Sequence, residues 1–103
     1  MNNFSNPSGQ KTASAVITAK PGLLHGLIIA PDAAGAGTVD LYDNASAASG
    51  TRLIPQITIV ATADNDRVKQ IDFKKPVKFH NGCYLAITVG AGALNTEVYT
   101  END

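Results

Sequence analysis

This chain of 103 residues has a single cysteine, a net charge close to zero and no long apolar run. Each of these features excludes a class of protein. Cys83 is the only cysteine, which excludes a disulfide within the chain and with it the small disulfide-rich scaffold. A net charge of −1 excludes a general binder of polyanions, so we expect no nucleic-acid partner. No apolar run approaches the roughly 18 residues of a membrane-spanning helix, so we expect no membrane partner. The lone cysteine is in keeping with a reducing compartment, which we expect for this protein. The first residues lack the basic start and apolar run of a signal peptide, so nothing in them indicates secretion.

Aromatic side chains are also few, at 6% of the chain, whereas alanine and valine contribute heavily to the 44% that is hydrophobic. We therefore expect a thin core built from small side chains. Surface scaling for a chain of this length predicts about 5,500 Å² of exposed surface and about 64% burial on folding, which leaves a single copy close to the margin of stability. Contact with further copies or with a larger assembly is the remaining way to add stability.

What the chain does contain is a succession of short runs rich in Val, Ile and Leu, each ended by a turn signal within about ten residues. The runs predict strands over residues 13–19, 23–30, 38–43, 52–60, 68–73, 77–79, 83–89 and 96–100. This pattern favours an all-β fold, an antiparallel two-sheet sandwich of about eight short strands with jelly-roll-like topology. Residues 1–12, rich in Asn, Ser, Gly and Pro, are predicted to form a polar N-terminal arm, and residues 13–103 a single β-sandwich domain.

Single residues within these runs predict local geometry. Gly26 lies in the middle of a strand, where glycine is typical of a bulge, and Pro55 places part of its strand at an edge or a bulge. Asn81-Gly82, between two apolar runs, is the strongest hairpin signal in the sequence. The alternation around Asp40 places that carboxylate on a solvated face, and Asp43 is predicted to be a turn residue.

Residue types that carry catalysis or bind metals are present, but their spacing does not fit those functions. Asp64–Asp66 starts like a calcium loop, yet the sixth and twelfth positions hold Lys69 and Lys75 instead of glycine and glutamate. Neither histidine has a Glu or Cys at ligand spacing, and Cys83 is predicted to belong to the core. The glycine pairs lack the lysine and helix of a phosphate loop, and no serine lies in a nucleophile-elbow pattern. We therefore expect no enzyme, no cofactor and no metal site.

Charge is distributed unevenly along the chain. Residues 67–80 carry an excess of four positive charges, and residues 31–66 carry an excess of four negative charges. A basic segment on one copy can face an acidic surface on the next copy or on a larger host protein, which gives an assembly its orientation. The alternative is a solvated strand edge whose lysines deter aggregation. The basic residues are Arg67, Lys69, Lys74, Lys75 and Lys78.

Four short segments resemble small β-rich structural proteins of tailed bacteriophages. They are Gly22-Leu23-Leu24-His25-Gly26, Leu41-Tyr42-Asp43-Asn44, Ser49-Gly50 and Phe79-His80-Asn81-Gly82, and the likeness spans about residues 14–100. Proteins of this kind include capsid cement or decoration proteins, which sit as trimers or dimers on the outside of a head lattice. The resemblance therefore implies a virion structural protein that is located on the capsid surface and assembled in the host cytoplasm.

The resemblance also implies partners, which are the major capsid protein and further copies of the chain as a homotrimer or homodimer. Each copy would bridge neighbouring capsid subunits, and many modest interfaces would add through multivalency to stabilise the head. The alternative is a phage tail or head-fibre accessory module that binds a host-surface receptor or glycan, with Tyr42, Tyr84 and Tyr99 available for sugar stacking. The residues expected at the protein interface are Asn2, Asn3, Phe4, Gln10, Arg67, Lys69, Lys74, Lys75 and Lys78.

Overall fold

Strands account for most of the residues that the computed structural model describes, which are residues 6–32, 35–60 and 68–102. Within these ranges the chain forms eight strands and no helix. The same ranges therefore hold no helix that is long and apolar enough to cross a membrane. In chain order the strands are β1 (Asn6–Pro7), β2 (Ala15–Thr18), β3 (Gly22–Pro31), β4 (Ala36–Tyr42), β5 (Ile57–Ile59), β6 (Lys69–Phe79), β7 (Cys83–Ala91) and β8 (Leu94–Asn102).

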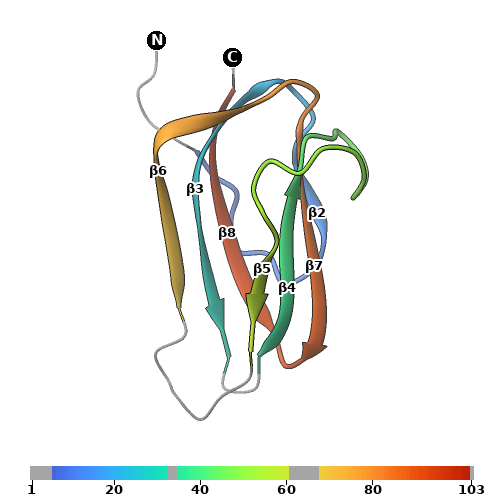
Figure 1. Ribbon diagram of the computed structural model, residues 1–103, viewed down its shortest axis with the longest axis vertical. Helices are drawn as coiled ribbons and strands as arrows, with labels where there is room; N and C mark the ends of the chain where they lie inside the picture. The colour runs from blue at the N-terminus through green and yellow to red at the C-terminus, as the bar shows by residue number, and fades with distance from the viewer. Residues whose placement is uncertain (1–5, 33–34, 61–67, 103) are drawn as a thin grey trace.

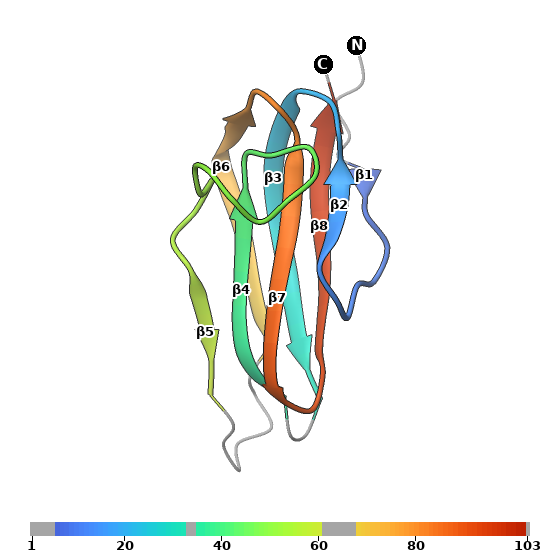
Figure 2. The ribbon, with the colours of Figure 1, turned by 90° about the vertical axis from the view of Figure 1, so that its right-hand side faces the viewer.

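The strands form two four-stranded antiparallel sheets that face each other (Figures 1 and 2). Sheet 1 has the order β1-β8-β3-β6, and sheet 2 has the order β2-β7-β4-β5. This is the strand order of an eight-stranded jelly roll. The predicted fold class, an antiparallel two-sheet sandwich, is confirmed. The exposed surface of 5744 Å² is close to the value expected from surface scaling.

Consecutive strands mostly lie in opposite sheets. Among the described strands, only β4 and β5 follow each other in the chain and also pair within one sheet. The predicted hairpin at Asn81-Gly82 is therefore wrong, although the dipeptide does lie at a turn. The residues that flank the turn pair with other strands, Phe79 with Gly22 in sheet 1 and Cys83 with Thr18 in sheet 2. Because the apolar runs on both sides of the turn must cover opposite walls of one core, the chain crosses between the sheets here.

The interior between the sheets is built mainly from leucine and isoleucine, so the prediction of a thin core of alanine and valine is wrong. Alanine is frequent in the sequence, but among the described residues only Ala86 is a buried alanine. Larger side chains bury more apolar surface at each core position, and they stabilise the fold accordingly. The buried cluster consists of Leu24, Leu27, Ile29, Val39, Leu41, Ile54, Ile59, Phe79, Cys83, Leu85, Ile87, Leu94 and Val98.

β3 carries the bulge that glycine predicts at position 26. Its pairing with β8 shifts register between Leu24 and Gly26, so His25 is the extra residue of that pair. Its pairing with β6 is interrupted at the same point, where residues 73–76 of β6 lie opposite His25. A bulge interrupts the strict alternation of side chains between the two faces of a sheet. As a result Leu24 and Leu27 are both buried in the core, although three positions separate them, and Ile28 faces outward.

β6 is one strand where the sequence predicts two, over residues 68–73 and 77–79. Its pairing with β3 stops after Asp72 and resumes at Val77. Pro76 lies in this interruption, where its missing N–H removes no hydrogen bond from the ladder. The predicted break is therefore an irregularity within a continuous strand.

The strand predicted over residues 52–60 is confined to residues 57–59. Arg52 still forms an isolated bridge to Tyr42, which places the start of the segment beside β4. Pro55 lies between this bridge and β5, and its lack of an N–H explains why the ladder is not continuous.

Asp40 is buried, with 5% of its surface exposed, so its predicted place on a solvated face is wrong. Its Oδ1 accepts a hydrogen bond from Arg52 Nε at 3.0 Å, and its Oδ2 accepts one from Gln56 Nε2 at 3.0 Å. The alternation of β4 does point Asp40 away from the core. The second half of the β4–β5 connection folds back beside β4, and its side chains Arg52 and Gln56 cover the carboxylate.

Part of the predicted N-terminal arm lies along β8. Asn6–Pro7 pair with β8 as β1, and the Ser8 N–H donates a hydrogen bond to the Val98 carbonyl at 2.9 Å. Lys11 exchanges two backbone hydrogen bonds with Thr96, at 2.7 and 2.8 Å. The described part of the arm therefore extends sheet 1 beyond β8.

Candidate functional site

The lysines predicted to lie at a protein interface are gathered on β6. Lys69, Lys74, Lys75 and Lys78 are all exposed. β6 is the last strand of sheet 1, so within the described ranges one side of it has no strand partner (Figure 1). Charged side chains along such an edge hinder indiscriminate pairing with other sheets. We call these four lysines and the outer side of β6 the lysine edge.

The other predicted interface residues do not join the lysine edge. Gln10 lies near β8, where its Nε2 donates a hydrogen bond to Asn95 Oδ1 at 3.0 Å. The neighbouring strand β1 and the lysine edge lie at opposite ends of the strand order of sheet 1. The predicted residues that fall outside the described ranges are Asn2, Asn3, Phe4 and Arg67.

Two carboxylates of the expected acidic segment, residues 31–66, are used inside the chain. Asp40 is buried against Arg52 and Gln56, and Asp43 binds backbone N–H groups of the turn at residues 80–82. Asp64–Asp66 falls outside the described residues. Asp40 and Asp43 are therefore engaged within the fold and are not the acidic groups that would face the lysine edge of another copy.

Asp43 ties the connection after β4 to the turn between β6 and β7. Its carboxylate accepts hydrogen bonds from the backbone N–H of His80 at 3.0 Å and of Asn81 at 2.7 Å. Partial burial raises the pKa of Asp43, but the N–H groups of Asn81, His80 and Gly82 stabilise the anion more strongly. The pKa therefore lies below the ordinary aspartate value of 3.8.

We expect Asp43→Ala to lower the free energy of unfolding by about 1 kcal/mol, and Asp43→Asn, which keeps one acceptor oxygen, to lower it by less. Because folding lowers the pKa of Asp43, the stability that the carboxylate contributes is fully present above its unfolded-state pKa and is lost as the pH falls through its folded-state pKa. The difference between wild type and Asp43→Asn should shrink from about pH 5 to pH 2. Urea unfolding across this range measures it, and a pH-independent difference would contradict the role of the carboxylate.

Cys83 lies fully buried between the sheets, as the sequence predicts. Burial, and secondarily the charge of Asp43, raises the pKa of its thiol to about 12. The thiol is therefore protonated at neutral pH, which makes it a poor nucleophile. In the part of the chain that the structure describes, no group of three or more His, Cys, Asp and Glu side chains could hold a metal ion.

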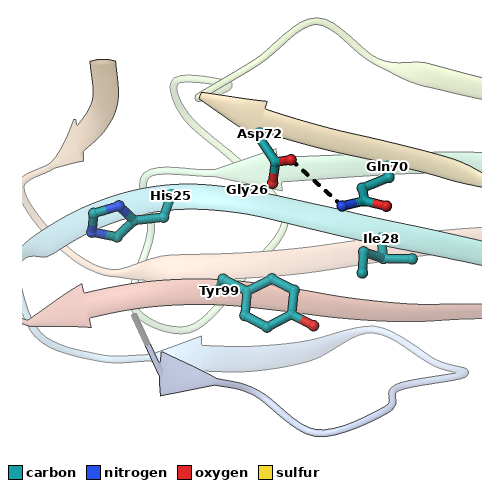
Figure 3. Close-up of a pocket in the computed structure, with 6 residues that line it drawn as sticks. All are labelled: His25, Gly26, Ile28, Gln70, Asp72 and Tyr99. Carbon is teal, nitrogen blue, oxygen red and sulfur yellow. Dashed lines mark hydrogen bonds between the residues drawn. The ribbon is translucent and has the colours of Figure 1, made fainter. Parts of the chain in front are cut away.

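A shallow depression of about 260 Å³ lies on the outer face of sheet 1, away from the core (Figure 3). β3 provides its central part, β6 one side and β8 the other. We call this site the sheet 1 depression. Its lining residues are His25, Gly26, Ile28, Gln70, Asp72 and Tyr99.

Gly26 forms the floor of the depression. In the register of sheet 1 it pairs with Asp72 on β6 and with Tyr99 on β8, so these three residues form one row across the sheet. Glycine has no side chain, so in this row no side chain stands between the Asp72 carboxylate and the Tyr99 ring (Figure 3). A β carbon at Gly26 would lie 3.4 Å from Asp72 Oδ1 and would clash with the backbone oxygen of Ile71.

The next row places Ile28 between Gln70 and Glu97. Hydrogen bonds connect the two rows on both sides of β3. Gln70 Nε2 lies 3.5 Å from Asp72 Oδ2, and the Tyr99 hydroxyl donates to Glu97 Oε1 at 3.4 Å. The polar groups of both rows are thus positioned by neighbours in the same sheet.

Tyr99 and His25 complete the electrostatics of the site. Desolvation and the negative charges of Glu97 and Asp72 raise the pKa of Tyr99, so its hydroxyl keeps its proton at neutral pH and can donate. His25, the extra residue of the bulge, has its Nε2 2.9 Å from Oε1 of Glu101. Both side chains are partly exposed, at 26% and 20%. The depression thus offers donors and acceptors beside an aromatic ring, an arrangement suited to holding a polar ligand.

No protein-family model, curated protein or solved structure matches this chain. The two candidate functional surfaces are the lysine edge and the sheet 1 depression. Sequence reasoning finds the lysines directly because they lie close together in the chain. It singles out Gly26 and Tyr99 separately, as a bulge and as a stacking residue, but only the pairing register brings them together with Asp72.

The other two tyrosines lie in sheet 2. Tyr42 on β4 pairs with Tyr84 on β7, and both side chains are partly buried. The Arg52 guanidinium lies over the Tyr42 ring, 5.5 Å from its centroid. Tyr84 therefore offers a matched position for experiments on Tyr99, since it is a half-buried tyrosine on a different sheet.

Proposed function

We propose that this chain is a virion structural protein, a capsid decoration protein without enzymatic activity that binds the outer surface of a major capsid lattice. The observation that carries the proposal is the lysine edge, in which four exposed lysines gather on one strand at the margin of a sheet. The jelly-roll strand order supports it, because this architecture is common among viral capsid proteins and also among lectins. The resemblance of the turn segments to small phage structural proteins favours the first of these groups.

The charge of the lysine edge indicates the kind of surface it would meet. Lysine side chains on an interface rim steer a protein toward an acidic partner and fix its orientation, while contributing modestly to affinity. Two aspartates of the chain's own acidic segment are engaged inside the fold, so the acidic partner we propose is the capsid protein. Assembly of the chain as a homotrimer or homodimer would multiply these modest contacts across the lattice.

Reversal of charge on the lysine edge tests the proposal. We expect Lys74→Glu with Lys75→Glu to weaken binding to a capsid shell by about tenfold or more, because two favourable charge contacts become repulsive. The matched control is Lys11→Glu with Lys20→Glu, which changes the net charge equally at positions away from β6. Cosedimentation with shells purified from particles that carry the chain, and stripped of it, measures the binding.

The control pair separates a local contact from a general charge effect. Equal weakening by both pairs would show that net charge alone governs binding, and unchanged binding by the β6 pair would overturn the role of the lysine edge. Quantitative mass spectrometry of the intact particles gives an independent test. Hundreds of copies per particle are expected for decoration, whereas a handful would indicate a tail or portal component instead.

A further inference from the structure

We infer that the sheet 1 depression is a binding site for a neutral sugar ring, a hexopyranose presented by a glycan. This goes beyond the proposed role in capsid decoration, and it rests on a different set of side chains. The observation that carries it is the row formed by Asp72, Gly26 and Tyr99, in which a carboxylate and an aromatic ring flank a glycine at the floor of the depression.

The apolar part of the site fits one face of a pyranose. A sugar ring in its chair form presents C–H groups on a face, and such groups pack against the face of an aromatic ring. Tyr99 supplies the ring, and Ile28 supplies an aliphatic surface on the neighbouring strand (Figure 3). Gly26 adds no side chain between Tyr99 and Asp72, so a ring that packs on Tyr99 can reach the polar groups on β6 across the depression.

The polar part of the site fits sugar hydroxyls, each of which can both donate and accept a hydrogen bond. The Asp72 carboxylate accepts, the Gln70 amide does both, and the Tyr99 hydroxyl does both. His25 adds a ring nitrogen at the end of the depression. A ligand with one kind of polar group only, such as a phosphate, would leave the acceptors of this set unmatched.

Size and charge narrow the ligand further. At about 260 Å³ the depression is slightly smaller than the ~300–1,000 Å³ typical of sites for drug-sized ligands, so one ring is the expected occupant. Asp72 lines the site, and Glu97 and Glu101 lie beside it on β8. These carboxylates repel an acidic sugar, so the inference commits to a neutral one.

The site is held by the sheet and does not depend on a loop. Tyr99 lies on β8 between β1 and β3, and Ile28 lies on β3 between β8 and β6. The hydrogen bond from Tyr99 to Glu97 and the contact between His25 and Glu101 restrict the side chains along its length. Side chains that are already ordered lose less conformational entropy when a ligand binds, so the free energy of binding is more favourable.

Titration of the isotopically labelled full chain with methyl glycosides tests the inference by nuclear magnetic resonance. The probes are the methyl pyranosides of glucose, galactose, mannose and N-acetylglucosamine, with N-acetylneuraminic acid as the acidic arm and glucosamine as the cationic arm. At least one neutral sugar is expected to bind with roughly millimolar affinity, as befits one small ring in a shallow site. The amide signals of Gly26, Gln70, Asp72 and Tyr99 should shift, and those of Tyr42 and Tyr84 should not.

Variants of Tyr99 separate stacking on the ring from other effects. Tyr99→Ala is expected to weaken sugar binding about tenfold or more, whereas Tyr99→Phe, which keeps the ring, should stay within about threefold of wild type. The matched control, Tyr84→Ala, removes a tyrosine from sheet 2 and should leave binding unchanged. Amide spectra of each variant without sugar report whether the fold is retained.

Three results would overturn the inference. One is the absence of binding by every neutral sugar at tens of millimolar with the folded wild-type chain. Another is preferential binding of the acidic or the cationic arm, which would assign the depression to a charged ligand. The third is an equal loss of binding in Tyr99→Ala and Tyr84→Ala, or shifts that cluster on sheet 2.

Discussion

Replacement of Phe79 with alanine is expected to lower the free energy of unfolding by about 3–5 kcal/mol. Phe79 is 0% exposed and is among the largest side chains that the fold buries completely. It ends β6 opposite Gly22, where a β carbon on the glycine would lie 3.0 Å from its ring. Truncation would leave a cavity that is not easily closed, because β3, the strand opposite Phe79, is paired on both sides at Gly22.

Phe73 provides the matched control for this prediction, since it lies on the same strand but is only partly buried. Phe73→Ala should cost clearly less, about 1–2 kcal/mol, because less apolar surface is lost from the interior. Chemical denaturation and thermal unfolding measure both variants, and Phe79→Ala should lower the melting temperature by more than about 10 °C. Similar losses in the two variants would show that the core does not centre on Phe79.

Gly37→Ala is expected to destabilise the chain by about 3 kcal/mol or more, or to prevent folding. Gly37 has a φ of +154°, a backbone conformation that residues other than glycine rarely adopt. A β carbon at this position would also clash with the backbone oxygen of Thr88. The position coincides with the register shift between β4 and β7, so movement of the strand to relieve the clash would break the pairing beyond it.

Gly50 distinguishes backbone strain from the steric clash. It also has a positive φ, +88°, but nothing lies within 4 Å of a β carbon built at that position. Gly50→Ala should therefore cost about 1–2 kcal/mol, from the left-handed conformation alone. If Gly37→Ala is no worse than Gly50→Ala in urea unfolding, the close approach to β7 does not constrain the sequence.

The fold class could be predicted from the sequence because it depends on local signals. Short apolar runs and turn residues can be recognised directly in the sequence, and glycine at position 26 indicates the bulge that the structure contains. The pairing of strands could not be predicted in the same way. Asn81-Gly82 indicates a turn, yet whether the flanking strands pair or separate into two sheets depends on which distant strands compete for them.

Burial was harder to predict than strand position. The alternation around Asp40 correctly points the carboxylate away from the core, but it carries no information about Arg52 and Gln56 folding over it from another segment. Composition misleads in a similar way for the interior, because counts of alanine do not say where the alanines lie. Long-range contacts decide both outcomes, and a local pattern does not contain them.

The candidate sites differ in the same respect. The lysine edge is a property of one strand, so the charges of Lys74, Lys75 and Lys78 predict its location directly. The sheet 1 depression combines residues from three strands and depends on the bulge that aligns Gly26 with Asp72 and Tyr99. A shift of one residue in either register would turn one of those side chains to the other face of the sheet.

The position of β8 has a consequence for how the chain is made. β8 is the last of the described strands in the sequence, yet it lies between β1 and β3 in sheet 1. On the ribosome the earlier strands must therefore wait, with the edge of β3 unsatisfied, until the C-terminal segment emerges. Folding that depends on such distant partners is slow and leaves apolar strands open to aggregation until the last strand is in place.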